Sequence, residues 1–414
     1  MVVIERKRDF KILMVCTEYP PMQGGIGRYT HNLVKSLRTK GGLKISVLSS
    51  SDGKEGDYKG LSPFAENNSE VIYELVQKIH PDIVHIQHEH GLYGLKLNPL
   101  FPSRTKTGLD KFYSICKVPI VSTFHTSYNF KLWMQSITIN GKDTLHLRYL
   151  YEFWMHLINY TSFKRTNSHA MSKSSAGIVL SNYMANLVPG TQVIYHGSES
   201  YQFKEIEQKK ARRLLSLPED KKILLVQGFL TATKGWDVIR KMNIPDDWNL
   251  VLNYSKNHYN KQIINLNLHN KKSLINLGKD YLSEEDLSLL FFASDVVFLP
   301  YKAIAGSGTM FDGLQHGKPF LASDNGFFSE FSKRGLGIIA KRNVHSFEKG
   351  LQMVDKKYDK LKANVDAFKE KLKWDVIAKQ HIDMYENILN NNGDKNNIPI
   401  IQPTSSKLQD QPLK

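Results

Sequence analysis

Residues 299–322 read LPYKAIAGSGTMFDGLQHGKPFLA, and the pattern around them predicts three successive elements. The apolar run at 296–300 predicts a buried strand, the small residues at 306–309 predict a flexible loop, and 310–316 predicts a short helix. A strand that leads through such a loop into a helix N-terminus can bind phosphate, because backbone N–H groups and the positive end of the helix dipole face the anion. The same pattern also occurs as a simple turn, so its meaning depends on the rest of the chain.

Three small residues of this loop, Ser307, Gly308 and Thr309, are the candidate phosphate ligands. Ser307 or Thr309 can cap the following helix and can also offer a hydroxyl group to a ligand.

Outward from this stretch, short apolar runs alternate with amphipathic segments. Continuous apolar strands are typical of a parallel sheet that is buried on both faces. The first alternation predicts strands at 10–17, 45–48, 82–87, 119–124, 176–180 and 192–195, with helices that include 69–80 and 145–164. The second predicts strands at 222–227, 250–254, 273–277, 296–300, 319–322 and 338–340, with helices at 236–242, 261–266, 284–293 and 310–316.

This alternation predicts an α/β fold of two doubly wound, Rossmann-like domains, with a ligand cleft between them at the carboxyl ends of their strands. A chain of 414 residues is too long for one ordinary core, which agrees with two domains. We expect an N-terminal domain at 1–197 and a C-terminal domain at 198–373. The amphipathic segment 374–389 is expected to form a last helix, and the Asn-, Pro- and Lys-rich residues 390–414 are expected to be disordered.

Hydropathy and cysteine content exclude several classes of protein. No run approaches the ~18 apolar residues of a membrane-spanning helix. The N-terminal MVVIERKRDF carries charge where a signal peptide needs an apolar core. Cys16 and Cys116 stand in apolar surroundings and are interpreted as reduced core thiols, not as a disulfide framework. These features favour a cytoplasmic protein.

The net charge of +16 is unevenly distributed. Residues 101–173 hold ten Lys and Arg against three Asp and Glu, a net charge of +7, together with aromatic residues such as Trp133 and Trp154. Basic and aromatic residues together are typical of a surface that meets anionic lipid head groups, which predicts peripheral association with the inner face of the membrane. An ordinary long core helix with solvated lysines explains the same pattern. Nucleic acid is disfavoured, because no recognised nucleic-acid-binding motif accompanies the charge.

A glycine-rich loop follows the first predicted strand. Gly24-Gly25-Ile26-Gly27 opens a helix, so it can let a bulky anionic ligand approach the backbone. It is not the dinucleotide fingerprint, since GxGxxG is absent and no acidic residue ends the next strand, KISVLSSS. The loop therefore argues against a nicotinamide-dependent dehydrogenase.

Two polar residues stand where predicted strands lead into the cleft. Lys234 begins the helix after 222–227 and can place its charge on a diphosphate leaving group. His125 directly follows 119–124, where it can donate a hydrogen bond to a sugar hydroxyl or lie beside the reacting carbon. The alternatives are a solvated lysine at a helix start and a structural histidine.

Three neighbouring histidines superficially resemble a metal site. His85 and His88 point to opposite faces of a strand, and no third ligand accompanies His88 and His90. No metal is expected there.

A series of motifs shares its order and spacing with one known family. The motifs are EYPPMQGGIGRYTHNLVKSL (18–37), DIVHIQHEHGLYG (82–94), AGIVLSNYMANLV (176–188), VIYHGSES (193–200), QGFLTATKGWDVI (227–239), SGTMFDGLQHGKPFLASDNGFFSE (307–330) and WDVIAKQHIDMYENIL (374–389). Together they span roughly residues 10–390. The chain resembles the retaining glycosyltransferases of family 4, which have the GT-B architecture.

The resemblance implies a nucleotide-diphosphate-sugar donor held mainly by the C-terminal domain, an acceptor held mainly by the N-terminal domain, and neither a metal nor another cofactor. It places Gly24 and Gly25 against the donor phosphates and sugar. It places His125 near the transferred sugar and Lys234 beside the diphosphate. The leaving phosphate, rather than a protein base, deprotonates the acceptor, and 374–389 is the helix that crosses back to the N-terminal domain.

Two departures from the family pattern are visible. Many members carry an arginine where this chain has Phe229, which leaves Lys234 to hold the diphosphate with little help. The paired glutamates of the family fall near Ile304, which cannot bind a sugar hydroxyl, and on Asp312, which can still reach a ribose hydroxyl. A sub-branch with an SG loop in place of the glutamates matches this chain at Ser307, which favours an active enzyme.

We therefore predict a retaining, metal-independent hexosyltransferase that uses a nucleotide-sugar donor and a lipid-linked or polysaccharide acceptor. The predicted catalytic residues are His125 and Lys234, and the predicted substrate-binding residues are Gly24, Gly25, Ser307, Gly308, Thr309 and Asp312. A non-catalytic nucleotide-sugar-binding partner of another transferase is the alternative that Phe229 and Ile304 leave open. An α-glucan phosphorylase or synthase fits less well, because the chain is short and no lysine suited to pyridoxal phosphate is recognisable.

Overall fold

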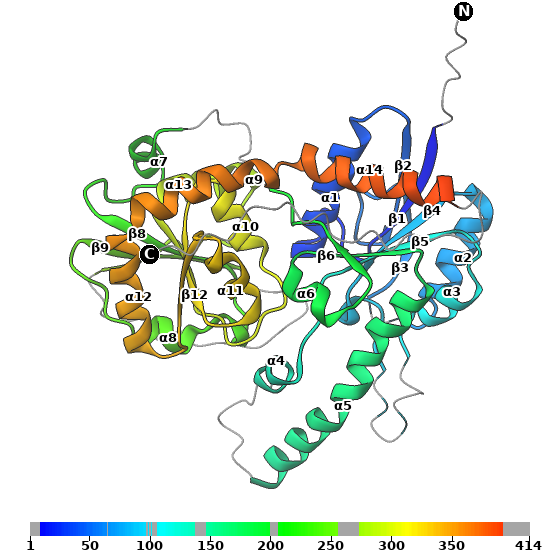
Figure 1. The fold of residues 1–414 in the computed structure, drawn as a ribbon, viewed down its shortest axis with the longest axis horizontal. Helices are drawn as coiled ribbons and strands as arrows, with labels where there is room; N and C mark the ends of the chain where they lie inside the picture. The colour runs from blue at the N-terminus through cyan, green and yellow to red at the C-terminus, as the bar shows by residue number, and fades with distance from the viewer. Residues whose placement is uncertain are drawn as a thin grey trace, which may run out of the picture.

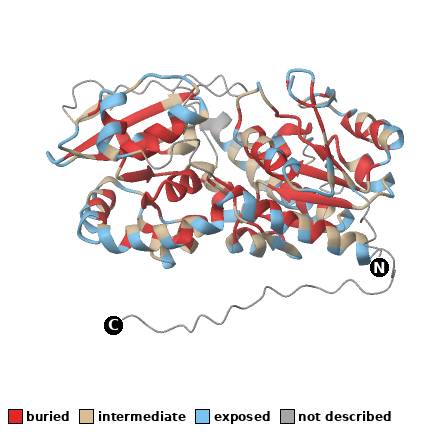
Figure 2. Ribbon diagram, turned by 90° about the horizontal axis from the view of Figure 1, so that it is seen from above, coloured by how far each residue is buried: buried red, intermediate tan, exposed pale blue. Residues whose placement is uncertain are grey.

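Two α/β halves lie side by side in the protein (Figure 1). The computed structural model describes residues 9–63, 65–96, 98, 101, 106–136, 146–198, 206–255 and 273–391. Each half is built on one parallel sheet, whose strands are largely buried between helices (Figure 2). This arrangement confirms the predicted α/β fold with two Rossmann-like units.

Seven parallel strands form the sheet of the N-terminal half, in the order β3-β2-β1-β4-β5-β6-β7. The strands are β1 (Phe10–Val15), β2 (Leu43–Ser50), β3 (Tyr58–Leu61), β4 (Ile83–His88), β5 (Ile120–Phe124), β6 (Ala176–Val179) and β7 (Thr191–Val193). The helices are α1 (Gly25–Arg38), α2 (Asn68–Ile79), α3 (Asp110–Ile115), α4 (Phe130–Gln135), α5 (His146–Lys173) and α6 (Asn182–Leu187). The strand order reverses between β1 and β4, and the carboxyl end of such a switch is where doubly wound sheets bind ligands.

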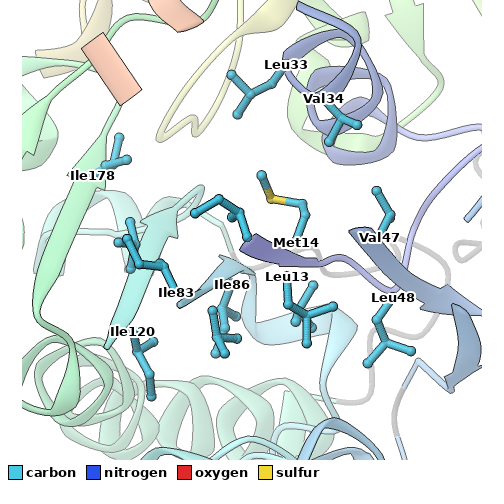
Figure 3. Packing of buried hydrophobic residues seen from close by; sticks show 14 of the residues in the cluster. Leu13, Met14, Leu33, Val34, Val47, Leu48, Ile83, Ile86, Ile120 and Ile178 are labelled. Atoms are coloured by element: carbon cyan, nitrogen blue, oxygen red, sulfur yellow. The ribbon is translucent and has the colours of Figure 1, made fainter. Parts of the chain in front are cut away.

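The core of this half follows from the continuous apolar strands. Leu13 and Met14 leave opposite faces of β1, and Met14 points toward Leu33 and Val34 of α1 (Figure 3). All four side chains are essentially inaccessible to solvent. Burying a side chain of this size stabilises the fold by about 1.5–3 kcal/mol, so a strand that is apolar on both sides is held between two layers of helices.

Six parallel strands form the sheet of the C-terminal half, in the order β10-β9-β8-β11-β12-β13. The strands are β8 (Lys222–Phe229), β9 (Trp248–Ser255), β10 (Leu274–Asn276), β11 (Val296–Leu299), β12 (Phe320–Ser323) and β13 (Gly337–Ala340). The helices are α7 (Gln208–Leu214), α8 (Trp236–Lys241), α9 (Glu284–Ala293), α10 (Gly308–Gln315), α11 (Gly326–Lys333), α12 (Val344–Lys356) and α13 (Tyr358–Lys369). Here the strand order reverses between β8 and β11.

The last helix connects the two halves. α14 (Trp374–Asn391) follows α13 and packs along α1 of the N-terminal half (Figure 1). Oη of its buried Tyr385 lies 2.6 Å from Nδ1 of His85, and this hydrogen bond ties the helix to β4. The Ser198 N–H donates to the Leu372 carbonyl at 2.8 Å, so the outgoing and returning segments of the chain are hydrogen-bonded to each other.

Several predicted bounds differ from the structure. The long helix predicted at 145–164 is α5, which continues to Lys173. Thr166, Asn167 and Ala170 in the added part are buried, so tertiary contacts stabilise a stretch whose polar sequence did not indicate a core helix. The edge strand β3 was not predicted, since it is only four residues long and mostly solvent-facing. The predicted helix at 261–266 and the residues after 391 lie outside the described part of the chain.

Candidate active site between the two halves

Two adjoining cavities form a cleft between the halves. The smaller, of about 180 Å³, is lined from one side by Gly25 and Arg28 and from the other by residues 227–229, Lys234 and 306–309, among others. The larger, of about 500 Å³, shares part of this lining. The loops that meet here follow β1, β4, β8 and β11, the four strands that flank the switch points. Both sheets therefore direct their ligand-binding edges into one cleft.

The loop after β11 leads directly into α10, which confirms the predicted strand, loop and helix. Ser307 is the N-cap, and its Oγ accepts a hydrogen bond from the Met310 N–H at 3.2 Å. The other N–H groups of the first turn belong to Gly308 and Thr309, and both residues line the smaller cavity. A Cβ on Gly308 would lie 3.3 Å from Nε2 of His196, so the glycine leaves room at this helix end. The arrangement presents a positive helix terminus to the cavity.

Lys234 ends a single 3-10 turn after β8 and lines the same cavity. Its Nζ donates to Oη of Tyr301 at 2.6 Å. The Lys302 N–H donates to the Thr233 carbonyl at 2.7 Å, so the loop after β11 is hydrogen-bonded to the turn that holds Lys234. Gly228 has a φ of +132°, and a Cβ there would lie 3.3 Å from Lys234 Nζ. The glycine therefore gives the strand end its backbone conformation and leaves space for the ammonium group.

The glycine-rich loop after β1 is closed by a carboxylate that the sequence did not single out. Oε2 of Glu18 accepts the N–H groups of Ile26 at 3.1 Å and Gly27 at 3.0 Å. A Cβ on Gly24 would lie 1.7 Å from the Glu18 carboxyl carbon. Glu18 thus caps the N-terminus of α1. Gly24 lines the larger cavity, and Gly25, which has open space around it, lines both cavities.

His125 lies just past β5 and lines the larger cavity. Its Nε2 is 2.8 Å from Oε1 of Gln87. Because an amide oxygen can only accept a hydrogen bond, this contact assigns the ring proton to Nε2 and leaves Nδ1 with an unprotonated lone pair. Burial lowers the pKa of His125 to about 3, with help from His196 and His88. At neutral pH the imidazole is therefore neutral, so Nδ1 can accept a hydrogen bond from a ligand, whereas we had expected a donor.

Glu89, which directly follows β4, also lines the larger cavity. Burial raises the pKa of Glu89 to about 7, although hydrogen bonds from Thr126 and from nearby backbone N–H groups act in the opposite direction. The cavity thus contains a carboxyl group that changes charge near neutral pH. The sequence placed this residue only beside the histidines, because its burial depends on the fold.

Asp312 lies in α10 and is 4 % exposed. Its Oδ1 accepts a hydrogen bond from Ser198 Oγ at 2.7 Å, and its Oδ2 accepts one from Arg28 Nη1 at 2.6 Å. Burial acts to raise the pKa of Asp312, but the charge and hydrogen bond of Arg28, together with His196 and Ser198, outweigh it and hold the pKa below its usual value. Both oxygens therefore already have a donor, and Arg28 joins the predicted site.

All eight predicted site residues line one of the two cavities. The smaller cavity includes Gly25, Lys234, Ser307, Gly308, Thr309 and Asp312, and the larger includes Gly24, Gly25, His125, Ser307 and Gly308. The roles predicted for them remain predictions. Among the described residues, no group of three or more His, Cys, Asp or Glu side chains is placed to hold a metal ion. His85 is instead bonded to Thr123 and Tyr385, and His88 packs on Phe124.

A comparison with protein-family models finds no match, and a comparison with curated proteins finds none either. Solved structures do match. Sucrose-phosphate synthase from Thermosynechococcus elongatus is 13% identical, with a TM-score of 0.64 over 92% of this chain and 99% of that one. A glycosyltransferase from Rickettsia africae is 18% identical, with a TM-score of 0.62 over the same shares of the two chains. The Anabaena protein HepE, solved in complex with UDP and glucose, is 15% identical, with a TM-score of 0.61 over 91% of this chain and 99% of that one.

The fold and the cleft define a two-domain α/β protein with its cleft between the domains. Its architecture is the GT-B fold, the arrangement of these structurally similar glycosyltransferases.

Proposed function

We propose that the chain is a glycosyltransferase that moves a hexose from a nucleotide-diphosphate sugar to a lipid-linked or polysaccharide acceptor, with retention of configuration and without a metal. One observation carries the proposal. The N-terminus of α10 and Lys234 line the same cavity, which shares residues 306–308 with the larger cavity that His125 lines. Two sources of positive charge at one point suit a diphosphate leaving group, and the adjoining space suits a sugar and its acceptor.

In the proposed reaction, the bond between the anomeric carbon and the diphosphate oxygen breaks while a bond to the acceptor oxygen forms on the same face. Lys234 and the first-turn N–H groups of α10 stabilise the charge that develops on the diphosphate. The acceptor proton passes to the departing phosphate oxygen. Asp312 accepts a hydrogen bond from a ribose hydroxyl through the carboxylate lone pairs that Arg28 and Ser198 do not use. Nδ1 of His125 accepts a hydrogen bond from the sugar.

Structural similarity supports the donor class. Anabaena HepE has been solved with UDP-glucose, at 15% identity and a TM-score of 0.60, and MnaA of S. aureus has been solved with UDP, at 13% identity and a TM-score of 0.55. A nucleotide-sugar is therefore the first class of ligand to examine.

A thermal-stability screen tests this proposal. UDP-, GDP- and ADP-sugars are added to the purified protein, because a ligand that binds only the folded state raises the melting temperature. We expect one base to stabilise the protein, with the free nucleoside as an inactive control. If no nucleotide-sugar shifts the melting temperature at millimolar concentration, the proposal is wrong.

The non-catalytic binding partner is retained as a second candidate for a specific reason. Phe229, at the position where the family resemblance expects an arginine, stacks on Tyr281 with ring centroids 6.0 Å apart. The position thus supplies an aromatic ring and no charge. A protein that is stabilised by a nucleotide-sugar but never releases the nucleoside diphosphate would be this binder.

Membrane contact is the second part of the proposal, and α5 is the element that would make it. α5 projects away from the N-terminal half, with α4 beside it (Figure 1). Leu150, Tyr151, Trp154 and Ile158 are 41–65 % exposed along one side of the helix. Arg165 is exposed seven residues further on, close to the same face. No helix in the described part of the chain has the length and apolar character needed to cross a bilayer.

We expect the protein to float with vesicles that contain anionic lipid at low salt. A Tyr151→Ser/Trp154→Ser variant should float much less, because each exposed ring that enters the head-group region contributes to binding. Added salt should weaken binding, since each Lys or Arg near an anionic surface is worth about 1 kcal/mol. Met353→Ser is the control, because Met353 is equally apolar and 45 % exposed but lies in the C-terminal half. Failure of the unmodified protein to float at low salt would discard the membrane contact.

A further inference from the structure

Arg28 is the basic side chain that the N-terminal half extends into the smaller cavity. It lies in the first turns of α1, one residue beyond the glycine-rich loop, and is 19 % exposed. Among the described residues that line this cavity, Arg28 and Lys234 are the Lys and Arg side chains. The two cations thus come from opposite halves of the protein.

In the structure, two acidic residues of the C-terminal half hold the Arg28 guanidinium. Nε and Nη2 donate to Oε1 and Oε2 of Glu284 at 2.5 and 2.7 Å, and Nη1 donates to Oδ2 of Asp312 at 2.6 Å. The contact to Glu284 is bidentate, which is the geometry in which a guanidinium also binds a phosphate group. Arg28 is therefore oriented as a ligand for a planar or tetrahedral anion.

The two acidic partners differ in how easily they can be replaced. The side chain of Asp312 is 5 % exposed and has Ser198 as a second donor, so it cannot be rehydrated in place. The side chain of Glu284 is 28 % exposed and begins α9, where the helix dipole favours a carboxylate even without a cation. Glu284 is thus the partner that Arg28 can release with the smaller penalty.

We propose that Arg28 is a second ligand of the donor diphosphate, and that Glu284 occupies its bidentate edge until the diphosphate replaces it. The proposal rests on the proposed function, since it assumes a diphosphate in the smaller cavity. Arg28 then supplies from the opposite half the charge that Phe229 does not supply. Asp312 keeps its contact to Nη1 during the exchange, so a bound donor links the two halves through one side chain.

Opposite effects of two substitutions test this exchange. Titrations with UDP, GDP, ADP and inorganic pyrophosphate measure diphosphate affinity, and uridine serves as a phosphate-free probe. We expect Arg28→Gln to weaken diphosphate binding by about tenfold or more, because a charge-assisted bidentate contact is lost. Glu284→Gln should strengthen it at least about twofold, since Arg28 loses a competing carboxylate. Arg28→Lys should restore part of the affinity, and uridine binding should not follow this pattern.

Arg38→Gln is the matched control, because Arg38 ends the same helix, pairs with Asp57 at the surface and does not line the cavity. A merely structural contact between the halves predicts that Arg28→Gln and Glu284→Gln both weaken binding. That result, or affinities within about twofold of the unmodified protein for both variants, overturns the proposal. Should Arg28→Gln fail to fold, Glu284→Gln still decides by the direction of its effect. An unmodified protein that binds none of the diphosphates overturns the proposed function as well.

Discussion

Replacing Lys234 with alanine should lower turnover of the nucleotide-diphosphate sugar by more than about tenfold, because one donor to the developing oxyanion is removed. The reason is electrostatic. Nζ of Lys234 lines the smaller cavity and is held over the Tyr301 ring, 4.0 Å from its centroid, so it is oriented before a ligand arrives. Its charge is needed most when the diphosphate departs, so kcat should fall more than donor affinity.

Two further variants make this result specific. Lys241→Ala removes an exposed lysine at the end of α8, outside the cavity, and should leave turnover unchanged. Lys234→Arg keeps the charge and should retain part of the activity. Steady-state kinetics with the donor identified in the screen provide the measurement, and near-normal turnover of Lys234→Ala would remove Lys234 from the mechanism.

Gly24→Ala destabilises the protein by about 3 kcal/mol, because the new methyl group meets a buried carboxylate. Gly24 has a φ of −167°, so its backbone is accessible to any residue and the restriction is one of space. The added Cβ would lie 1.7–2.0 Å from the carboxyl atoms of Glu18. Glu18 would have to leave the half-buried N–H group of Ile26 and the buried N–H group of Gly27, which would then lose their acceptor.

Gly25→Ala is the control for this effect on stability. Apart from its chain neighbours and the backbone of its own helix, no atom lies within 4 Å of a Cβ built on Gly25, so the substitution should leave the melting temperature nearly unchanged. Thermal and urea unfolding of the two variants give the comparison. Equal stability of Gly24→Ala and the unmodified protein would mean that Glu18 does not hold the start of α1.

Much of the fold could be predicted from the sequence, because buried parallel strands are apolar on both faces and stand out in any window. The run FKILMV and the run VVFL each became a central strand. Elements whose stability depends on tertiary contacts were harder to predict. β3 is a short edge strand with little apolar character, and the second half of α5 is polar in sequence yet partly buried.

Some residues of the candidate site could likewise be predicted from local sequence, and others could not. Ser307 and Lys234 lie in the short connections between a strand and the next helix, and Gly308 begins such a helix, so local sequence predicts that all three reach the cleft. Arg28 and its partner Glu284 are 256 residues apart in sequence, and no local pattern connects them. The capping of the Gly24 loop by Glu18 was not predicted either, because the sequence does not show that this carboxylate folds back over the loop.

The central claim is that the cleft transfers a sugar from a nucleoside diphosphate. Release of nucleoside diphosphate from the stabilising nucleotide-sugar tests it most directly, with the unmodified protein and Lys234→Ala assayed in parallel. Our account predicts slow release to water by the unmodified protein, faster release when an acceptor is added, and a strong loss in the variant. Tight binding of the donor with no release, in the presence of membrane or glycan acceptors, would contradict the account.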